Sequence, residues 1–209
     1  MDRRTAGIAG GVLVVAAVLL GMLVTWVPAA DLMDTGWNSL MGDMRRPWAV
    51  DAALIFNWIG GGWRATFLVP LVIAGILLVF RRWREALFAL AAFAVSAGIV
   101  QLLKNVLGRA RPADLLVASD FGSFPSGHTA NAATIAVVLW LIAPRVWVAL
   151  LGALWTVAMA LSRTLLSVHW LTDTLGGVLI GAGAGLLVAA VLWGWLRWER
   201  RPPRAERAA

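Results

Sequence analysis

The 209-residue sequence contains no cysteine, one lysine and two histidines, and only 14% of its residues are charged. Without cysteine the chain has no disulfide framework, no thiol nucleophile and no thiolate metal site, and its redox compartment cannot be inferred from this residue. Because lysine and histidine are so scarce, general surface chemistry does not account for them. The positions of Lys104, His128 and His169 are therefore informative.

The composition is that of a membrane protein. Hydrophobic residues make up 61% of the chain and the mean hydropathy is +0.81, whereas a soluble domain contains about 45–50% apolar residues. The net charge of +7 comes almost wholly from arginine. Nucleic-acid binding would need a basic face on a soluble fold, and none is visible. Positive loops that flank apolar spans explain the charge instead.

Six runs without charged residues are candidate membrane spans. They cover residues 8–27, 65–80, 86–103, 122–144, 146–162 and 174–196. A helix needs roughly 20 apolar residues to cross a bilayer core of about 30 Å. The first run is long enough to be a retained span, although the residues after it loosely resemble a signal-peptide cleavage site. We therefore predict an all-α integral membrane protein with six transmembrane helices and a single domain over residues 1–209.

The arginines predict the orientation. Six spans place both termini on one side, and putting that side in the cytoplasm assigns most of the basic residues to it, as the positive-inside rule requires. The end of the third span, the start of the fourth, the end of the fifth and the start of the sixth then share the outer face. The alanine- and arginine-rich composition is typical of a high-GC bacterial genome, so the expected location is the bacterial cytoplasmic membrane.

The first outer connection, residues 31–63, is amphipathic. Apolar residues recur near the helical period in its first half: Leu32, Met33, Trp37, Leu40, Met41 and Met44. A second short repeat follows at Val50, Leu54 and Trp58. We predict short amphipathic helices in the membrane surface, either shaping an entry route for a lipid or serving only in packing. The Arg- and Pro-rich tail, residues 199–209, is predicted to be disordered and to contact anionic lipid.

Three ionisable residues interrupt the apolar sequence between the fifth and sixth spans: Arg163, His169 and Asp173. Such groups beside a membrane segment indicate function. On one helix, His169 and Asp173 would share a face, because they are four positions apart. A carboxylate on one imidazole nitrogen fixes the tautomer and leaves the other nitrogen free to attack an electrophile. The alternative is a helix end with an interfacial arginine and a satisfied His–Asp pair.

Two further clusters flank the loop between the third and fourth spans. Lys104 and Arg111 are seven positions apart and can both point at one anion, although a basic patch beside the membrane would look the same. Ser126 is a candidate N-cap, and Gly127 lets backbone approach a ligand closely. The free N–H groups of that helix start suit a phosphate, with His128 beside it. The alternative is an ordinary capped helix with an interfacial histidine.

The predicted topology brings all three clusters to the outer face, and their spacing resembles a known signature. Lys104 with Arg111 and Pro112 reads KxxxxxxRP, residues 125–128 read PSGH, and residues 162–173 read SRxxxxxHxxxD. These three ordered motifs resemble the type-2 phosphatidic acid phosphatase superfamily, and every fixed position is present. The signature covers residues 104–173, and the six-span layout extends the resemblance over nearly the whole chain.

The resemblance implies a role for each motif residue. His169 would be the nucleophile that forms a phosphohistidine, Asp173 would orient it, and His128 would act first as acid and then as base. The residues implied to hold the phosphoryl oxygens are Lys104, Arg111, Ser126, Gly127 and Arg163. Members of the family work without a metal or another cofactor.

Three charged residues in the nearby loop are not given a role. Arg109, Asp114 and Asp120 are interpreted as solvated loop charges.

The implied activity is removal of a terminal phosphate from a membrane lipid. Candidate substrates are phosphatidic acid, phosphatidylglycerol phosphate and isoprenyl diphosphates such as undecaprenyl diphosphate, and the motifs do not choose among them. A non-catalytic protein that binds or transports phosphorylated lipids is the alternative, but it has no use for a His–Asp pair. An ion channel would need polar residues near the span midpoints, and these spans contain few. The sequence carries no signal for the oligomeric state.

Overall fold

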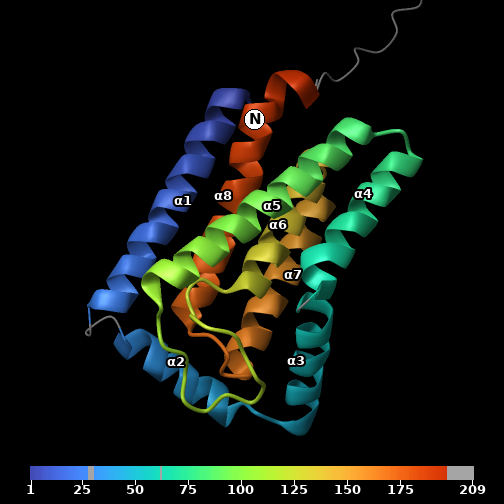
Figure 1. The fold of residues 1–209 in the computed structure, drawn as a ribbon. Coiled ribbons are helices and arrows are strands. Elements are labelled where there is room, and N and C mark those ends of the chain that lie inside the picture. Colours follow the sequence, from blue (N-terminus) through green and yellow to red (C-terminus); the bar gives the residue numbers. More distant parts are fainter. Residues whose placement is uncertain (28–30, 62, 197–209) are drawn as a thin grey trace, which may run out of the picture.

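The computed structural model describes residues 1–27, 31–61 and 63–196, and this part of the chain forms helices and loops without strands. The elements are α1 (Arg3–Trp26), α2 (Asp31–Asp43), α3 (Pro47–Gly60), the π-helix η2 (Arg64–Leu68), α4 (Val69–Val79), α5 (Trp83–Leu107), α6 (Gly127–Ile142), α7 (Val146–Leu165) and α8 (Leu171–Leu196). The long helices run side by side as a bundle, and α2 and α3 lie toward one end of it (Figure 1). The all-α prediction is confirmed.

Several of these helices can cross a membrane. Within the described ranges, α1, α5, α7 and α8 are long and apolar enough, and α3 with η2 and α4 would make a fifth span bent by 52°. Helix α6 is apolar but has 16 residues, which corresponds to about 24 Å at 1.5 Å per residue. The chain is therefore a multi-pass helical membrane protein. The count of six spans and the single domain stay predictions.

The fourth predicted span starts later than its uncharged run. Residues 122–126 belong to the loop, and α6 begins at Gly127 because Ser126 caps it. The Ser126 hydroxyl accepts a hydrogen bond from the Thr129 N–H at 3.4 Å, which satisfies one of the free donors of the first turn. The third span runs longer than predicted, to the residue before Gly108. That glycine ends α5 with φ at +56°, a left-handed conformation that favours glycine.

Helix α8 lies at the centre of the bundle, between α1 and the pair of α5 and α6 (Figure 1). Gly181 allows this packing, because a Cβ there would lie 2.1 Å from the carbonyl oxygen of Ala130 on α6. Small residues let helix backbones approach closely in membranes. Helix α7 differs, since Leu150, Leu154 and Val157 are exposed along it. That face is suited to lipid.

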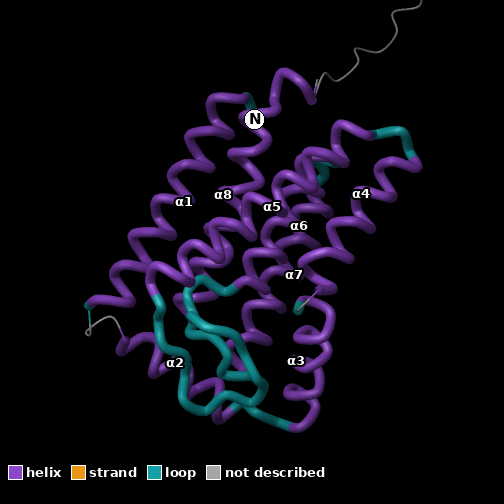
Figure 2. The backbone as a smooth tube through the Cα atoms, in the orientation of Figure 1, coloured by secondary structure: helices purple, strands orange, loops and turns teal. Residues whose placement is uncertain are grey.

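One end of the bundle gathers most of the irregular backbone. The end of α5, the start of α6, the end of α7 and the start of α8 lie there, with the 108–126 loop and helices α2 and α3 (Figures 1 and 2). The start of α1 lies at the opposite end. The prediction that these four helix ends share one face is confirmed, whereas the side of the membrane that they face stays a prediction.

The connection over residues 31–63 contains helices at both predicted places, α2 and α3. Their location in a membrane surface stays a prediction. The tail, residues 199–209, lies outside the described residues, as do residues 28–30 next to the first span.

Candidate active site

A cavity of about 500 Å³ lies where the three motifs meet. Its walls include Lys104 from α5, His128 from α6, Arg163 from α7 and His169 from the turn before α8. The Gly127 residue at the start of α6 also lines it. The structure therefore brings the three clusters of the sequence to one cavity.

The other three motif residues support this wall from behind. They are Arg111, Ser126 and Asp173. The nearest of them is Arg111, whose Nη1 lies 3.4 Å from Nε2 of His169. Ser126 and Asp173 are fully buried, so neither meets solvent directly.

His169 and Asp173 contact each other, although not on one helix as predicted. Helix α8 begins at Leu171, so His169 precedes it and Asp173 lies in its first turn. The helix begins there because the carboxylate of Asp34 accepts the Thr172 N–H at 3.0 Å, which caps the helix from outside the local sequence. Nδ1 of His169 still lies 3.4 Å from Oδ2 of Asp173.

The two imidazole nitrogens of His169 have different surroundings. Nδ1 faces Asp173 at ion-pair distance but makes no aligned hydrogen bond, and such bonds are often long before substrate binds. Nε2 faces Arg111. Burial lowers the pKa of His169, and Asp173 offsets this only partly. The ring is therefore neutral at pH 7, with a lone pair available for attack.

Two cations of the first motif share one carboxylate. Lys104 Nζ lies 3.1 Å and Arg111 Nη2 lies 2.7 Å from Oδ1 of Asp120, and both donate to the Gly122 carbonyl at 2.9 Å. The Asp120 side chain is 61% exposed, as predicted for a loop charge, but the prediction missed its pairing. Burial would raise the pKa of Asp120, yet the two cations outweigh burial and lower it. A carboxylate thus occupies the place between these cations.

Arg163 is almost completely buried, and its described partners are neutral. Its guanidinium donates to Oδ1 of Asn57 at 2.7 Å and to the Ala53 carbonyl at 3.3 Å, both on α3, and to the Ser162 hydroxyl at 3.2 Å. None of the ion pairs within the described ranges involves it. A buried cation without a counter-charge favours an anion beside it. No pattern in the sequence predicted that α3 holds this arginine.

His128 lies in the first turn of α6 and packs against the end of α3. A Cβ at Gly61 would lie 2.8 Å from its Nε2, so only glycine fits there. That nitrogen is buried and has no hydrogen-bond partner among the described residues. The Ser126 hydroxyl oxygen accepts hydrogen bonds from the N–H and the Oγ1 of Thr129. Ser126 therefore acts first as the cap of α6.

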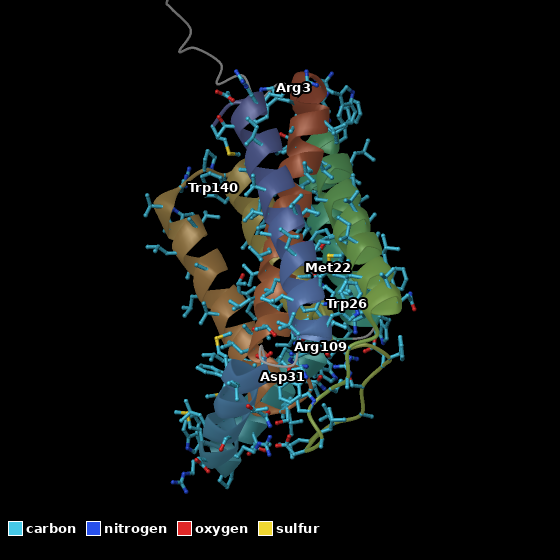
Figure 3. The ribbon with its side chains drawn as sticks, turned by 90° about the vertical axis from the view of Figure 1, so that its left-hand side faces the viewer. Arg3, Met22, Trp26, Asp31, Arg109 and Trp140 are labelled. Atoms are coloured by element: carbon cyan, nitrogen blue, oxygen red, sulfur yellow. The ribbon has the colours of Figure 1, made fainter. Side chains whose placement is uncertain are left out.

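Arg109 contradicts its interpretation as a solvated loop charge. It is 7% exposed and donates to Oδ1 of Asp173 at 2.6 Å and to Oδ2 of Asp34 at 2.7 Å. Figure 3 shows Arg109 beside Asp31 and the start of α2. Burial alone would lower the pKa of Arg109, but Asp173 and Asp34 raise it. No local pattern could have found this contact, since Asp34 is 75 positions away.

Asp114 is more engaged than predicted as well. Its carboxylate forms an ion pair with Arg45 at 2.7 Å and accepts hydrogen bonds from Asn38 and Ser167. Arg45 also contacts Ser167. This cluster joins the segment after α2 to the loop after α5 and to the turn before α8. Its residues do not line the cavity.

The charged groups facing the cavity suit an anion. The cations Lys104 and Arg163 line the cavity together with the carboxylate of Asp120, and Arg111 lies behind the wall beside His169. The described residues contain no cluster of three or more potential metal-ligating side chains. Cations at fixed positions stabilise phosphoryl oxygens. The site can therefore bind a phosphate beside a neutral imidazole.

The chain has relatives of known name. The profile of the PAP2 superfamily matches residues 85–197. Phosphatidylglycerophosphatase B of Bacillus subtilis is 31% identical over 152 residues, which are 66% of this chain and 72% of that protein. The undecaprenyl-diphosphatase of Sulfolobus acidocaldarius is 30% identical over 124 residues, which are 55% of this chain and 59% of that protein.

Two crystal structures resemble the fold. A transmembrane PAP2 type phosphatidylglycerolphosphate phosphatase from Bacillus subtilis has a TM-score of 0.75 at 24% identity and covers 92% of this chain and 98% of its own. LpxE of Aquifex aeolicus has a TM-score of 0.65 at 28% identity and covers 74% and 93%. The matched profile extends over more than half of the sequence and contains all three motifs that meet at the cavity, and by this the chain belongs to the PAP2 superfamily.

Proposed function

We propose that this membrane-bound lipid phosphatase removes a terminal phosphate from a lipid through a phosphohistidine on His169. The observation that carries the proposal is the placement of its two nitrogens. Nδ1 lies 3.4 Å from Asp173, while Nε2 faces Arg111 beside the cavity. A neutral ring with a carboxylate beside Nδ1 and a phosphate-binding cation beside Nε2 is the arrangement that a nitrogen nucleophile needs.

The first step forms a bond between Nε2 of His169 and phosphorus and breaks the bond between phosphorus and the lipid oxygen. Lys104, Arg111 and Arg163 stabilise the charge on the phosphoryl oxygens, and the Gly127 backbone at the start of α6 adds a donor. The ring becomes positively charged as the bond forms, and Asp173 balances that charge through Nδ1. Ser126 contributes by holding the start of α6 in place.

His128, which lines the same cavity, handles the protons. As an acid it protonates the departing lipid oxygen. As a base it then takes a proton from water, which attacks phosphorus and releases inorganic phosphate and free His169. The location of both imidazoles on one cavity supports this assignment.

The substrate is proposed to be a lipid with a terminal phosphate or diphosphate. The relatives named above act, by their names, on phosphatidylglycerophosphate and on undecaprenyl diphosphate. Phosphatidic acid, phosphatidylglycerol phosphate and isoprenyl diphosphates are the compounds to test. Release of inorganic phosphate from each of them in EDTA measures the preference and the metal requirement in one experiment.

The proposed membrane placement has six spans, with both termini in the cytoplasm and the cavity at the outer face of a bacterial cytoplasmic membrane. The gathering of the 108–126 loop and of the helix ends that carry the motifs at one end of the bundle supports a single active-site face. Cysteines introduced into the exposed part of this loop, such as Ala118→Cys, should react with an impermeant thiol reagent added to intact cells. Labelling only after lysis would refute the orientation.

The His169→Ala variant tests the nucleophile. We expect turnover to fall at least about a thousandfold, because the covalent route is lost, while the variant still binds a phosphorylated lipid. Labelled substrate should leave acid-labile phosphate on the wild-type protein and none on the variant. Retained turnover would refute the nucleophile, and a wild-type protein that binds without turnover would support the binding or transport alternative.

A further inference from the structure

Arg109 lies between two buried carboxylates on different helices. Nη1 lies 2.6 Å from Oδ1 of Asp173 at the start of α8, and Nη2 lies 2.7 Å from Oδ2 of Asp34 on α2. The two carboxylates are 0% and 1% exposed, and the arginine side chain is 5% exposed. Burying three charges costs desolvation free energy unless the charges are paired with one another and hydrogen-bonded.

The arrangement continues beyond these three groups. Oδ1 of Asp34 accepts the Thr172 N–H at 3.0 Å, and its Oδ2 accepts the Thr172 hydroxyl at 2.5 Å. That hydroxyl also accepts a hydrogen bond from Arg109 at 2.8 Å. Asp34 therefore holds both the first turn of α8 and the arginine. The carboxylate of Asp173 is left with one oxygen on Arg109 and the other toward His169.

We propose that Arg109 and Asp34 are positioning residues for the reaction: they fix the orientation and the charge of Asp173, and through it the nucleophilic His169. This inference rests on the proposed nucleophilic role of His169. Neither residue lines the cavity, so neither is proposed to touch the substrate. Helix α2, which the sequence predicts only as a surface element, thereby becomes part of the support of the active site.

The orientation follows from the shape of the guanidinium. Its planar fork places two nitrogens toward two carboxylates at once, so rotation of Asp173 would break a 2.6 Å contact. Oδ2 of Asp173 is fixed from its other side by the Trp170 N–H at 2.9 Å. With both oxygens held, Oδ2 stays toward Nδ1 of His169, and Nε2 keeps its position beside Arg111.

The effect on the charge state of His169 follows from the net charge of the three buried groups. The buried residues Asp34, Arg109 and Asp173 together carry one negative charge, which balances one imidazolium as His169 bonds to phosphorus. Asp31 also lies 3.5 Å from Arg109, but its side chain is 58% exposed and its charge is screened by solvent. Lys104 and Arg111 also act on His169, and His128 faces it from α6. Because these neighbours are cations or a histidine, the net negative charge of the buried group is the main influence that favours a positive ring.

Two substitutions change this charge in opposite directions. Arg109→Gln leaves two carboxylates without their cation, and the acid limb of the kcat/KM profile should move to higher pH. Asp34→Asn keeps one oxygen to accept the Thr172 N–H but replaces the other oxygen with a donor, which leaves Arg109 to neutralise Asp173, and the same limb should move to lower pH. Each shift is expected to be at least about half a pH unit. A merely structural role would not move the limb in opposite directions.

The separate changes in kcat and KM provide a second readout. We expect kcat to fall roughly 10- to 100-fold in Arg109→Gln, the range for removal of an orienting partner, with KM within about threefold because the cavity is untouched. Arg109→Lys keeps the charge and loses the fork, so it should lower kcat while its acid limb stays at the wild-type pH. If Arg109→Gln does not fold, Asp34→Asn and Arg109→Lys still decide the question.

The controls separate this inference from the proposed function. Asp43→Asn removes the same charge from an exposed position of α2 and should keep wild-type kcat and pH profile. Unchanged pH profiles in folded Arg109→Gln and Asp34→Asn, or an effect on KM alone, would overturn the positioning role. If those profiles stay unchanged while His169→Ala is inactive, only this inference fails. If His169→Ala stays active, the proposed function itself fails.

Discussion

Arg109 and Arg111 are two positions apart in one loop and are both mostly buried, yet they have opposite surroundings. Arg109 contacts two carboxylates that are themselves buried. Arg111 contacts one exposed carboxylate, three backbone carbonyls and the ring of His169. Burial lowers the pKa of Arg111 by more than the nearby acidic residues raise it. For Arg109 the two carboxylates outweigh burial, and its pKa is raised.

The different partners of the two arginines show how a buried cation can be assigned either a structural role or a role in ligand binding. A cation whose charge is balanced by equally buried carboxylates has little to gain from another anion. A cation balanced only by an exposed loop carboxylate can exchange that partner for a phosphate. The residue type is the same and the burial of the side chains is similar, at 5% and 9% exposed, so the partners decide.

The largest effect that this comparison predicts is at Arg111. Replacing it with methionine removes a bidentate donor from the phosphoryl oxygens, and we expect kcat/KM to fall about a thousandfold. Binding of inorganic phosphate or vanadate, followed by calorimetry, should weaken in the same variant. Arg109→Gln should retain that binding. Loss of binding in Arg109→Gln with retention in Arg111→Met would reverse the assignment of the two arginines.

The pH dependence is the next effect in size. Burial lowers the pKa of His169, Asp173 raises it partly, and Arg111 lowers it again. The ring must be neutral to attack, so kcat/KM should lose about tenfold per pH unit below an acid limb that lies under the ordinary histidine value of about 6.5. A rate profile on the purified protein measures this. An acid limb above 6.5 would mean that Asp173 outweighs burial and both neighbouring cations.

The smallest effect concerns Asp120, which occupies the place between Lys104 and Arg111. Asp120→Asn removes a competing carboxylate that is 61% exposed, and partly exposed ion pairs contribute about 0.2–1 kcal/mol. We therefore expect KM to fall about threefold with little change in kcat. Asp114→Asn is the matched control, because it changes the same charge in the same loop away from the cavity, and its KM should stay at the wild-type value. A higher KM in Asp120→Asn would show that this carboxylate helps to build the site.

Local sequence was sufficient for much of the candidate site. The helical fold follows from the apolar runs, and Ser126 was recognised as a cap because N-capping depends on neighbours three residues away. The meeting of Lys104, His128, Arg163 and His169 followed from the direction of successive spans, since helices that alternate in direction return their ends to one face. These arguments need only the order and length of the segments.

The partners of the charged residues were decided by the tertiary structure alone. Arg163 contacts Asn57 across 106 positions, and Arg109 contacts Asp34 across 75. Helical periodicity relates residues within a few turns, so it carries no information about which side chains of α2 and α3 reach the loop and the end of α7. The sequence by itself thus determined which groups are proposed to do the chemistry. Only packing decided which of these groups face the cavity and which hold the others in place. The reason is that the role of a buried charge depends on the group that it contacts.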